Sequence, residues 1–286
     1  MIWTISSLLT WSTEYFTKHH IDNPHLEAEI LLSHALKLKR IELYIKHDKE
    51  LNESELASYK TLILRRAKKE PSAYIIGNKA FMSLDFIVSP AVLIPRPETE
   101  HLVEAVIDYS KTVEYPINIL DIGTGSGAIA ISLANYIKNA TVMAIDISND
   151  SLLIAKQNAK KHEVESRITF LQSDLYSNIP SLNKFDVIVS NPPYIPSIEV
   201  EKLQEEIIKY EPIKALDGGD DGMALYSKII PGSIAYLKSK GYLILEIGQG
   251  QFLSVNKIIV DTGLFNEAKI IKDYADIERI VIVQKK

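Results

Sequence analysis

Four consecutive residues, Asn191-Pro192-Pro193-Tyr194, carry the clearest chemical signal in the chain, and they directly follow the apolar run from Phe185 to Ser190. Proline fixes its own backbone angle and donates no hydrogen bond, so the carbonyl groups of this loop stay free to accept. If the Asn191 oxygen and the Pro192 carbonyl accept both N–H bonds of a planar amide or amino group, charge collects on its nitrogen and the lone pair can be aimed. Tyr194 would stack on the planar group.

This stretch therefore predicts a site that positions a nitrogen atom for attack, with Asn191, Pro192 and Tyr194 as catalytic residues. Catalysis of that kind needs geometry and electrostatics rather than a strong base. The structural alternative is a rigid loop in which Asn191 is a turn residue and Tyr194 packs in the core.

A glycine-rich segment lies upstream, between an expected strand and an expected helix, and reads Leu120-Asp121-Ile122-Gly123-Thr124-Gly125-Ser126-Gly127. Glycines let the backbone turn sharply and let a ligand lie against main-chain amides. The segment favours a nucleoside or dinucleotide site. By itself it could also be a purely structural turn.

Two acidic residues follow the next two expected strands. Asp146 ends the second strand, where a carboxylate can accept both hydroxyls of a ribose. Asp174 ends the third, within Ser173-Asp174-Leu175, where an acid can accept a hydrogen bond from an adenine amino group. Either acid alone could be a helix N-cap. Together with the glycine segment they indicate a bound nucleoside.

The spacing also separates two cofactors. A nicotinamide enzyme favours Gly-x-Gly-x-x-Gly with a helix N-terminus facing a pyrophosphate, whereas the glycines here alternate as Gly-x-Gly-x-Gly. Asp121 sits where it would repel a pyrophosphate but could bind the amino group of a methionyl moiety. The pattern therefore favours S-adenosylmethionine.

The elements that must hold these residues alternate between strands and helices beyond Glu98, which predicts a parallel sheet covered by helices on both faces. Ligands of such a sheet lie beyond the carboxyl ends of its strands. The expected strands are Ile117 to Leu120, Thr141 to Ile145, Ile168 to Leu171, Phe185 to Ser190, Tyr242 to Ile247, Ala268 to Ile271 and Ile280 to Val283. The expected helices are Ala128 to Ile137, Ser151 to Lys161 and a helical stretch that includes Val200 to Ile208.

The first part of the chain has a helical period instead. Asn23 followed by Pro24 is typical of a helix start, and Asn52 with Glu55 resembles a capping box that opens a helix closed by Pro71. From Lys79 to Val88 the period changes, which suggests a short hairpin between two domains. We expect the domain boundary near residues 72 to 90.

Composition narrows the function classes. The 286 residues are 46% hydrophobic, contain no cysteine and carry a formal charge of −5. Disulfides, thiolate metal sites and a cysteine nucleophile are excluded, and the histidines show no metal-ligand spacing, so no metal is expected. No apolar run is long enough for a membrane span, and no signal peptide pattern is present, so a cytoplasmic protein is expected.

The chain resembles the protein-glutamine methyltransferase family that modifies peptide chain release factors. The Asp121 to Gly127 loop and the Asn191 to Tyr194 loop match that family's cofactor and substrate motifs. Further similar segments are Glu27 to Leu32, Tyr74 to Gly77 with Phe81, Leu93 to Glu100 and Leu216 to Gly222. The Leu93 to Glu100 segment resembles the release-factor branch more than the branch acting on a ribosomal protein.

The resemblance implies an α/β, Rossmann-like S-adenosylmethionine-dependent methyltransferase domain with a seven-strand sheet whose last strand is antiparallel, at residues 98–286. It also implies a small N-terminal helical domain for substrate recognition at residues 1–75 and a β-hairpin connector at residues 76–97. The acceptor would be the glutamine of a Gly-Gly-Gln motif, methylated on its side-chain amide nitrogen. The implied cofactor-binding residues are Asp121, Gly123, Thr124, Gly125, Ser126, Gly127, Asp146, Asp174, Leu175 and Asn191, and the implied substrate-binding residues are Asn191, Pro192, Pro193 and Tyr194. Arg96 and Glu98 could line the site, or could pair and cap the following helix.

Two other functions remain alternatives. One is a methyltransferase acting on a ribosomal-protein glutamine or on the amino group of adenine in DNA, whose family shares the Asn191 to Tyr194 motif. A DNA enzyme must hold a track of phosphates, and a net charge of −5 argues against it, so release factors are the expected partners and no direct nucleic-acid substrate is expected. The other is a non-catalytic module that keeps the cofactor and only docks on a partner.

Overall fold

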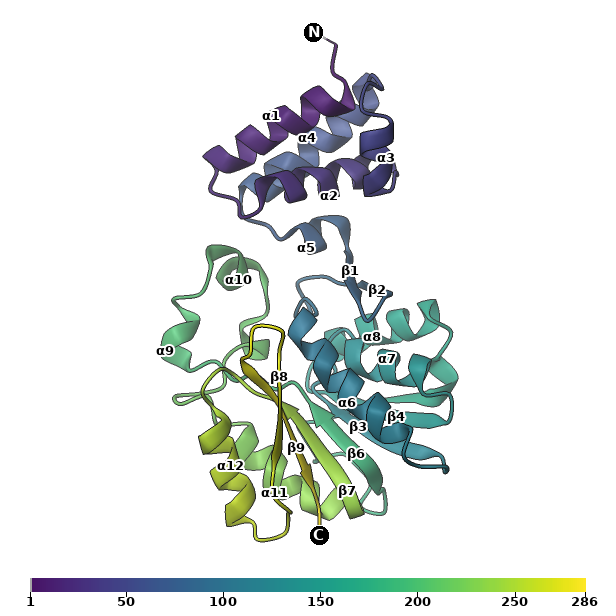
Figure 1. The fold of residues 1–286 in the computed structure, drawn as a ribbon, viewed down its shortest axis with the longest axis vertical. Helices are drawn as coiled ribbons and strands as arrows, with labels where there is room; N and C mark the ends of the chain where they lie inside the picture. The colour runs from purple at the N-terminus through teal and green to yellow at the C-terminus, as the bar shows by residue number, and fades with distance from the viewer. Residues whose placement is uncertain (1) are drawn as a thin grey trace. The chain divides into compact units, whose positions relative to one another are not determined.

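The computed structural model describes residues 2–286, which form two compact units (Figure 1). One unit contains the described residues up to Asn78 together with the separate segment Gln204–Tyr210. The other contains Lys79–Leu203 and Glu211–Lys286.

The first unit is a helical bundle, as the sequence predicts. Its elements are α1 (Ile5–Lys18), α2 (Pro24–Leu36), α3 (Arg40–Ile45), α4 (Glu53–Ala67), α5 (Ser72–Ile76) and α10 (Glu205–Tyr210). The predicted capping box is confirmed, because Asn52 Oδ1 accepts from Glu55 N and Glu55 Oε2 accepts from Asn52 N, each at 2.9 Å. Pro71 does not close α4 as expected. The helix ends at Ala67, and Pro71 is instead the N-cap of α5.

A buried arginine joins α10 to the bundle. The Arg66 side chain is only 4% exposed and pairs with Glu27 at 2.7 Å and with Glu206 of α10 at 2.8 Å. The Tyr210 hydroxyl donates to the Lys68 carbonyl oxygen at 3.0 Å. These contacts attach a helix that follows the Asn191 to Tyr194 loop in sequence to helices that precede it.

The predicted hairpin is present as β1 (Asn78–Phe81) and β2 (Leu84–Ile87). Met82 and Ser83 form its turn with positive φ angles of 48° and 56°. The Met82 backbone is held at both ends, since its N–H donates to Glu100 Oε1 at 2.7 Å and its carbonyl accepts from the Tyr136 hydroxyl at 2.6 Å. The hairpin turn is therefore fixed to the helices of the second unit.

The second unit is built on a seven-stranded sheet of order β5-β4-β3-β6-β7-β9-β8 (Figure 1). Its strands are β3 (Ile117–Ile122), β4 (Ala140–Asp146), β5 (Ile168–Gln172), β6 (Phe185–Ser190), β7 (Leu237–Glu246), β8 (Lys269–Lys272) and β9 (Glu278–Gln284). The first five pair in parallel, and β9 runs antiparallel to both of its neighbours. The antiparallel last strand expected from the family resemblance is confirmed.

Helices cover both faces of this sheet, as the strand and helix alternation predicts. They are α6 (Glu100–Ser110), α7 (Ala128–Tyr136), α8 (Asn149–Lys161), α11 (Tyr226–Tyr236) and α12 (Phe252–Asp261). The short helix α9 (Ser197–Val200) lies away from the sheet, and short 3-10 turns occur at η1 (Pro97–Thr99), η2 (Glu165–Arg167) and η3 (Ile213–Ala215). The expected helical stretch that includes Val200 to Ile208 is divided into two helices, because α9 ends at Val200 and α10 begins only at Glu205.

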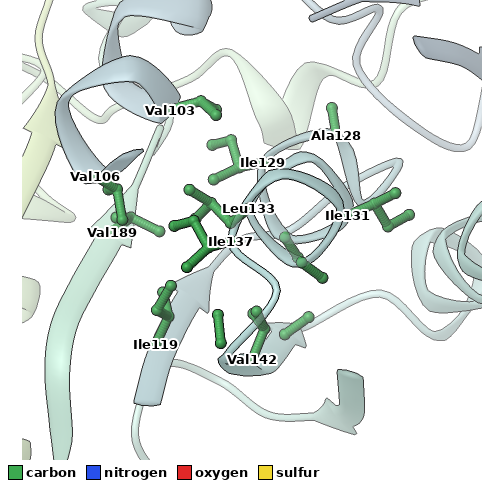
Figure 2. Close-up of a cluster of buried hydrophobic side chains, with 14 of the residues drawn as sticks. Val103, Val106, Ile119, Ala128, Ile129, Ile131, Leu133, Ile137, Val142 and Val189 are labelled. Atoms are coloured by element: carbon green, nitrogen blue, oxygen red, sulfur yellow. The ribbon is translucent and has the colours of Figure 1, made fainter. Parts of the chain in front are cut away.

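Strand β6 shows how the sheet separates two cores. Val187 and Val189 belong to the cluster under α6 and α7, whereas Ile188 belongs to the cluster under α11 and α12. Successive side chains of a strand point to opposite faces, so a strand in the middle of the sheet must be apolar throughout. Figure 2 shows the first cluster, with Val103 and Val106 of α6 and Leu133 of α7 gathered beside Ile119 and Val189.

The register places the functional motifs at one edge. Ile122, the last residue of β3, pairs with Ile145 of β4 and with Ser190 of β6, and the Ser190 hydroxyl donates to the Ile122 carbonyl oxygen at 2.8 Å. The residues that follow these strand ends, including Gly123 and Asn191, therefore emerge side by side.

We expect Arg66→Ala to destabilise the helical unit by roughly 3 kcal/mol, because the partly buried Glu27 and Glu206 carboxylates would lose their counter-charge. Arg65→Ala is the matched control: Arg65 is 41% exposed and pairs with Glu70, so its loss should cost less than about 1 kcal/mol. Denaturant unfolding of the whole chain measures both values. Equal effects of the two substitutions would contradict the structural role of Arg66.

Candidate active site

A cavity of about 530 Å³ opens beyond the carboxyl ends of the parallel strands. It lies where ligands of such sheets bind. The predicted site residues that line it are Gly123, Gly125, Asp146, Asp174, Leu175, Asn191, Pro192 and Pro193. The predicted residues that do not line it are Asp121, Thr124, Ser126, Gly127 and Tyr194. The structure thus brings the two predicted motifs to a single cavity.

The glycine segment is a tight loop with positive φ at all three of its glycines: 74° at Gly123, 55° at Gly125 and 81° at Gly127. An added Cβ would meet no atom within 4 Å at Gly123 or Gly125, which face the cavity. At Gly127 it would lie 2.7 Å from Ile131 Cδ1. The first two glycines therefore leave space for a ligand, and the third allows α7 to pack closely.

Asp121 lies beneath this loop rather than on the cavity wall. It is fully buried, and its Oδ2 accepts a hydrogen bond from the Thr124 hydroxyl at 2.6 Å. Oδ1 has no hydrogen-bond partner among the described residues. Burial raises the pKa of Asp121 to about 7. A buried carboxylate with an unpaired oxygen is costly in the free protein and suits a cationic partner.

Asp146 lines the cavity at the end of β4. Its Oδ2 accepts from Gly125 N and its Oδ1 accepts from Ser148 N, each at 2.9 Å, while burial raises its pKa. Each carboxylate oxygen has a second lone pair that can accept a ligand hydroxyl. Asp174 is exposed on the cavity wall, and Leu175 beside it adopts a positive φ of 48°.

The Asn191 side chain is held by a residue far away in the sequence. Asn191 Nδ2 donates to the Thr99 hydroxyl oxygen at 3.0 Å, and the Thr99 hydroxyl donates to Glu246 Oε2 at 2.6 Å. Within residues 2–286, no hydrogen bond reaches Asn191 Oδ1 or the Pro192 carbonyl oxygen. Two acceptors of the predicted loop are therefore available to a ligand.

Tyr194 is held from behind the loop. Its hydroxyl donates to Glu246 Oε1 at 3.4 Å, and its side chain packs against the core under α11 and α12. Burial and the nearby Glu246 carboxylate raise its pKa, so its hydroxyl stays protonated. The expected stacking of Tyr194 on a planar acceptor is a prediction that this geometry does not test.

Glycines of the segment from Leu216 to Gly222 pack against the backbone of the Asn191 to Tyr194 loop. An added Cβ would lie 2.8 Å from Tyr194 Cα at Gly218 and 2.4 Å from the Tyr194 carbonyl oxygen at Gly222. That oxygen also accepts from Gln251 Nε2 at 2.7 Å. Gly218 and Gly222 are therefore required by their close approach to the site loop.

Arg96 and Glu98 were expected either to line the site or to pair with each other, and the structure shows neither arrangement. Arg96 pairs with the buried carboxylate of Glu211 at 2.5 Å, and Glu211 also accepts from Ile94 N at 3.2 Å. Arg96 therefore neither pairs with Glu98 nor lines the cavity. Glu98 lies near Glu246, whose pKa it helps to raise.

Sequence reasoning did not single out Thr99 or Glu246 as site residues, nor several cavity walls. Those walls include Ala91 to Leu93, Pro212 to Ala215 and Ile147, an isoleucine that is 61% exposed. Most of these wall residues are apolar and match no ligand-binding motif. In the sequence they are distinguished only by lying near the predicted motifs. Ile147 could have been identified from the sequence, because it is an apolar residue directly after Asp146, a predicted cofactor-binding residue at the end of a strand.

Two family models match the chain. The one described as the PrmC N-terminal domain matches residues 7–77, and the one described as a methyltransferase domain matches residues 116–263. The release factor glutamine methyltransferase of Geobacter sulfurreducens is 42% identical over 280 residues, which cover 98% of this chain and 96% of that protein. The protein of the same name from Rhodopirellula baltica is 40% identical over 287 residues, which cover 99% and 97%.

A solved methyltransferase structure from Pyrococcus furiosus has the same fold, with a TM-score of 0.51 at 19% identity, covering 80% of this chain and 98% of that one. The predicted Rossmann-like methyltransferase fold is thereby confirmed. In the described part of the chain, no helix is long and apolar enough to cross a membrane, and no three His, Asp or Glu side chains are grouped to hold a metal ion.

We expect Gly123→Ala and Gly127→Ala to fail in different ways. Both positions have positive φ, which costs about 1 kcal/mol for a residue other than glycine. Gly127→Ala should also lower the unfolding temperature because its Cβ collides with Ile131, whereas Gly123→Ala should stay folded and lose cofactor affinity. Thermal unfolding and calorimetric titration with S-adenosylmethionine distinguish the two; the same loss of stability in both variants would contradict the assignment.

We expect the stability of the ligand-free protein to fall as pH rises from about 5 to 8. Burial holds the pKa of Asp121 near 7 in the folded state, above its unfolded value of about 3.9, so the folded state binds more protons in this window and loses stability as they leave. Asp121→Asn should reduce this slope. Unfolding midpoints at pH 5.5 and 8 give the measurement, and an unchanged slope would show that Asp121 does not cause it.

Proposed function

Because this chain belongs to the family of release factor glutamine methyltransferases, we propose that it methylates a glutamine side chain of peptide chain release factors. The acceptor is the glutamine of the Gly-Gly-Gln motif, the reacting atom is its amide nitrogen, and the methyl donor is S-adenosylmethionine. The observation that carries this proposal is the pair of free acceptors, Asn191 Oδ1 and the Pro192 carbonyl oxygen, at the cavity beside the glycine loop. The identity to relatives of that name over nearly the whole chain supports it.

The cavity residues fit S-adenosylmethionine. The glycine loop leaves space for a nucleoside, Asp146 has lone pairs for the ribose hydroxyls, and Asp174 offers a carboxylate to the adenine amino group. Asp121 would stabilise the cationic amino group from beneath the loop, because its Oδ1 has no other partner among the described residues. When bound, the cofactor supplies an electrophilic methyl group on a sulfonium sulfur.

The protein acts on the acceptor amide by positioning it. An amide nitrogen is a poor nucleophile because its lone pair is delocalised into the carbonyl group. Asn191 Oδ1 and the Pro192 carbonyl oxygen accept its two N–H bonds, which concentrates charge on nitrogen and orients the amide. Pro193 keeps the loop rigid, and Tyr194 stacks on the amide plane. The methylated nitrogen would be cationic and therefore strongly acidic, so its surplus proton can pass to solvent and no strongly basic side chain is required.

The helical domain would recognise the body of the release factor, since a three-residue motif offers little surface for specificity. We keep the expected ranges for this assignment: residues 1–75 for recognition, 76–97 for the connector and 98–286 for catalysis. Comparing kcat/KM for an intact release factor and for a short Gly-Gly-Gln peptide tests it. We expect the intact protein to be preferred through KM, and equal values would remove the helical domain from recognition.

We propose that the reaction takes place in the cytoplasm on a protein substrate, without a direct nucleic-acid substrate. The net charge of −5 supports this, because a nucleic-acid enzyme usually presents an excess of Lys and Arg to the phosphates.

The decisive assay incubates the chain with labelled S-adenosylmethionine and unmethylated release factor, either wild type or with the Gly-Gly-Gln glutamine changed to alanine. We expect label on the wild-type factor alone. Asn191→Ala should lower kcat by about 100-fold, the effect of removing one preorganised hydrogen-bonding group. Label on neither factor, with cofactor binding intact, would redirect the function to a ribosomal protein or to DNA adenine.

A further inference from the structure

A buried carboxyl group that the proposed reaction does not use lies behind the acceptor loop. Glu246, at the end of β7, is 1% exposed. Its Oε2 accepts from the Thr99 hydroxyl at 2.6 Å, and Thr99 in turn accepts from Asn191 Nδ2 at 3.0 Å. A buried acid destabilises a protein unless it is bonded or has a function, so its contact with the site requires an explanation.

The number of protons available fixes which group donates in each of these two hydrogen bonds. A threonine hydroxyl has a single proton, and an ionised carboxylate can only accept. The Thr99 proton therefore goes to Glu246, and the Thr99 oxygen can only accept from its other neighbour. That neighbour must be the NH₂ end of Asn191, because the opposite orientation would place two oxygens 3.0 Å apart with no proton between them.

Thr99 and Glu246, the two residues behind Asn191 in this series of hydrogen bonds, are buried in the protein. Thr99 is 5% exposed at the end of η1, just before α6. The Glu246 carbonyl oxygen accepts from the Tyr226 hydroxyl at 2.7 Å, and its second carboxylate oxygen accepts from Tyr194 at 3.4 Å. Water is excluded here, so these hydrogen bonds are stronger than they would be at the surface.

We propose that Thr99 and Glu246 are positioning residues that fix the side-chain amide of Asn191 with its oxygen toward the acceptor. The inference rests on the proposed function, because it names how Asn191 is made to accept from the glutamine amide. A rotated Asn191 would present N–H groups to the N–H groups of the glutamine, and the activating hydrogen bond would be lost.

Three threonine variants test the role of Thr99. Thr99→Val keeps the shape and removes the hydroxyl, Thr99→Ser keeps the hydroxyl, and Thr112→Val is a matched control at an exposed position. We expect Thr99→Val to lower kcat about tenfold or more, with cofactor Kd and KM for release factor changed less than about twofold. Thr99→Ser should recover most of the lost rate, and Thr112→Val should behave like the wild type.

Glu246→Gln provides a second test that does not depend on how Thr99→Val folds. The carboxyl group accepts from the Thr99 and Tyr194 hydroxyls and lies near the charges of Arg279 of β9 and Glu98 of η1, while the Tyr226 hydroxyl bonds to the Glu246 main chain. Burial raises the pKa of Glu246 to about 7. Its protonation frees the Thr99 proton and allows Asn191 to rotate, so kcat of the wild type should fall below about pH 7. Glu246→Gln should be slow at all pH values and should lack this limb.

The outcomes separate the inference from the proposed function. A wild-type protein that transfers no label to release factor would overturn both. Full activity in Thr99→Val, no recovery in Thr99→Ser, or an acidic limb that persists unchanged in Glu246→Gln would overturn the inference while the proposed function stands. A parallel loss of cofactor binding or of unfolding temperature in Thr99→Val would assign Thr99 a purely structural role.

Discussion

A side-chain amide has a donor end and an acceptor end of almost the same shape, so a site that uses one must determine which end meets the ligand. In this chain the recognising group and the proposed acceptor are both amides, and their binding depends on opposite ends facing each other. Asn191 cannot set its own orientation, since rotation about one bond exchanges the two ends. The ionised carboxylate of Glu246, acting through the single proton of Thr99, removes this symmetry. In the proposed reaction, methyl transfer to a weak nucleophile would therefore depend on a charge that does not touch the nucleophile.

The backbone of the loop that carries Asn191 must also have a single, fixed conformation. Two prolines restrict it from within, and Gly218, Gly222 and Gln251 hold it from outside through close approach and a hydrogen bond to the Tyr194 carbonyl oxygen. The core beneath is apolar on both faces of β6, so the strand that ends in this loop has little freedom to move. Rigidity here is useful because the rate gained by positioning falls steeply with small displacements.

Much of this structure could be predicted from the sequence, for reasons that are local. Strand β6 was predicted with its observed bounds because a fully buried parallel strand is a short, uninterrupted apolar run, and the Asn52 capping box was recognised by its spacing. Failures arose where a distant contact overrides the local pattern. Pro231 lies inside α11, where a helical pattern normally excludes proline. The helix α10 begins after a turn and carries Glu206, which pairs with the distant Arg66. The link from Asn191 to Glu246 joins residues that no sequence spacing connects.

The segment Gln204–Tyr210 belongs to the helical unit although it lies within the sequence of the other unit. The polypeptide passes between the two compact units at Asn78, again at Leu203 and again at Tyr210, so the helical unit is not a simple N-terminal extension. Its Arg66 depends on a glutamate that is encoded after the catalytic motif. A chimaera between relatives that exchanges only the first 78 residues would separate this pair and join two unmatched halves. An exchange of the helical unit that keeps this ion pair together therefore has to include residues 204–210 as well.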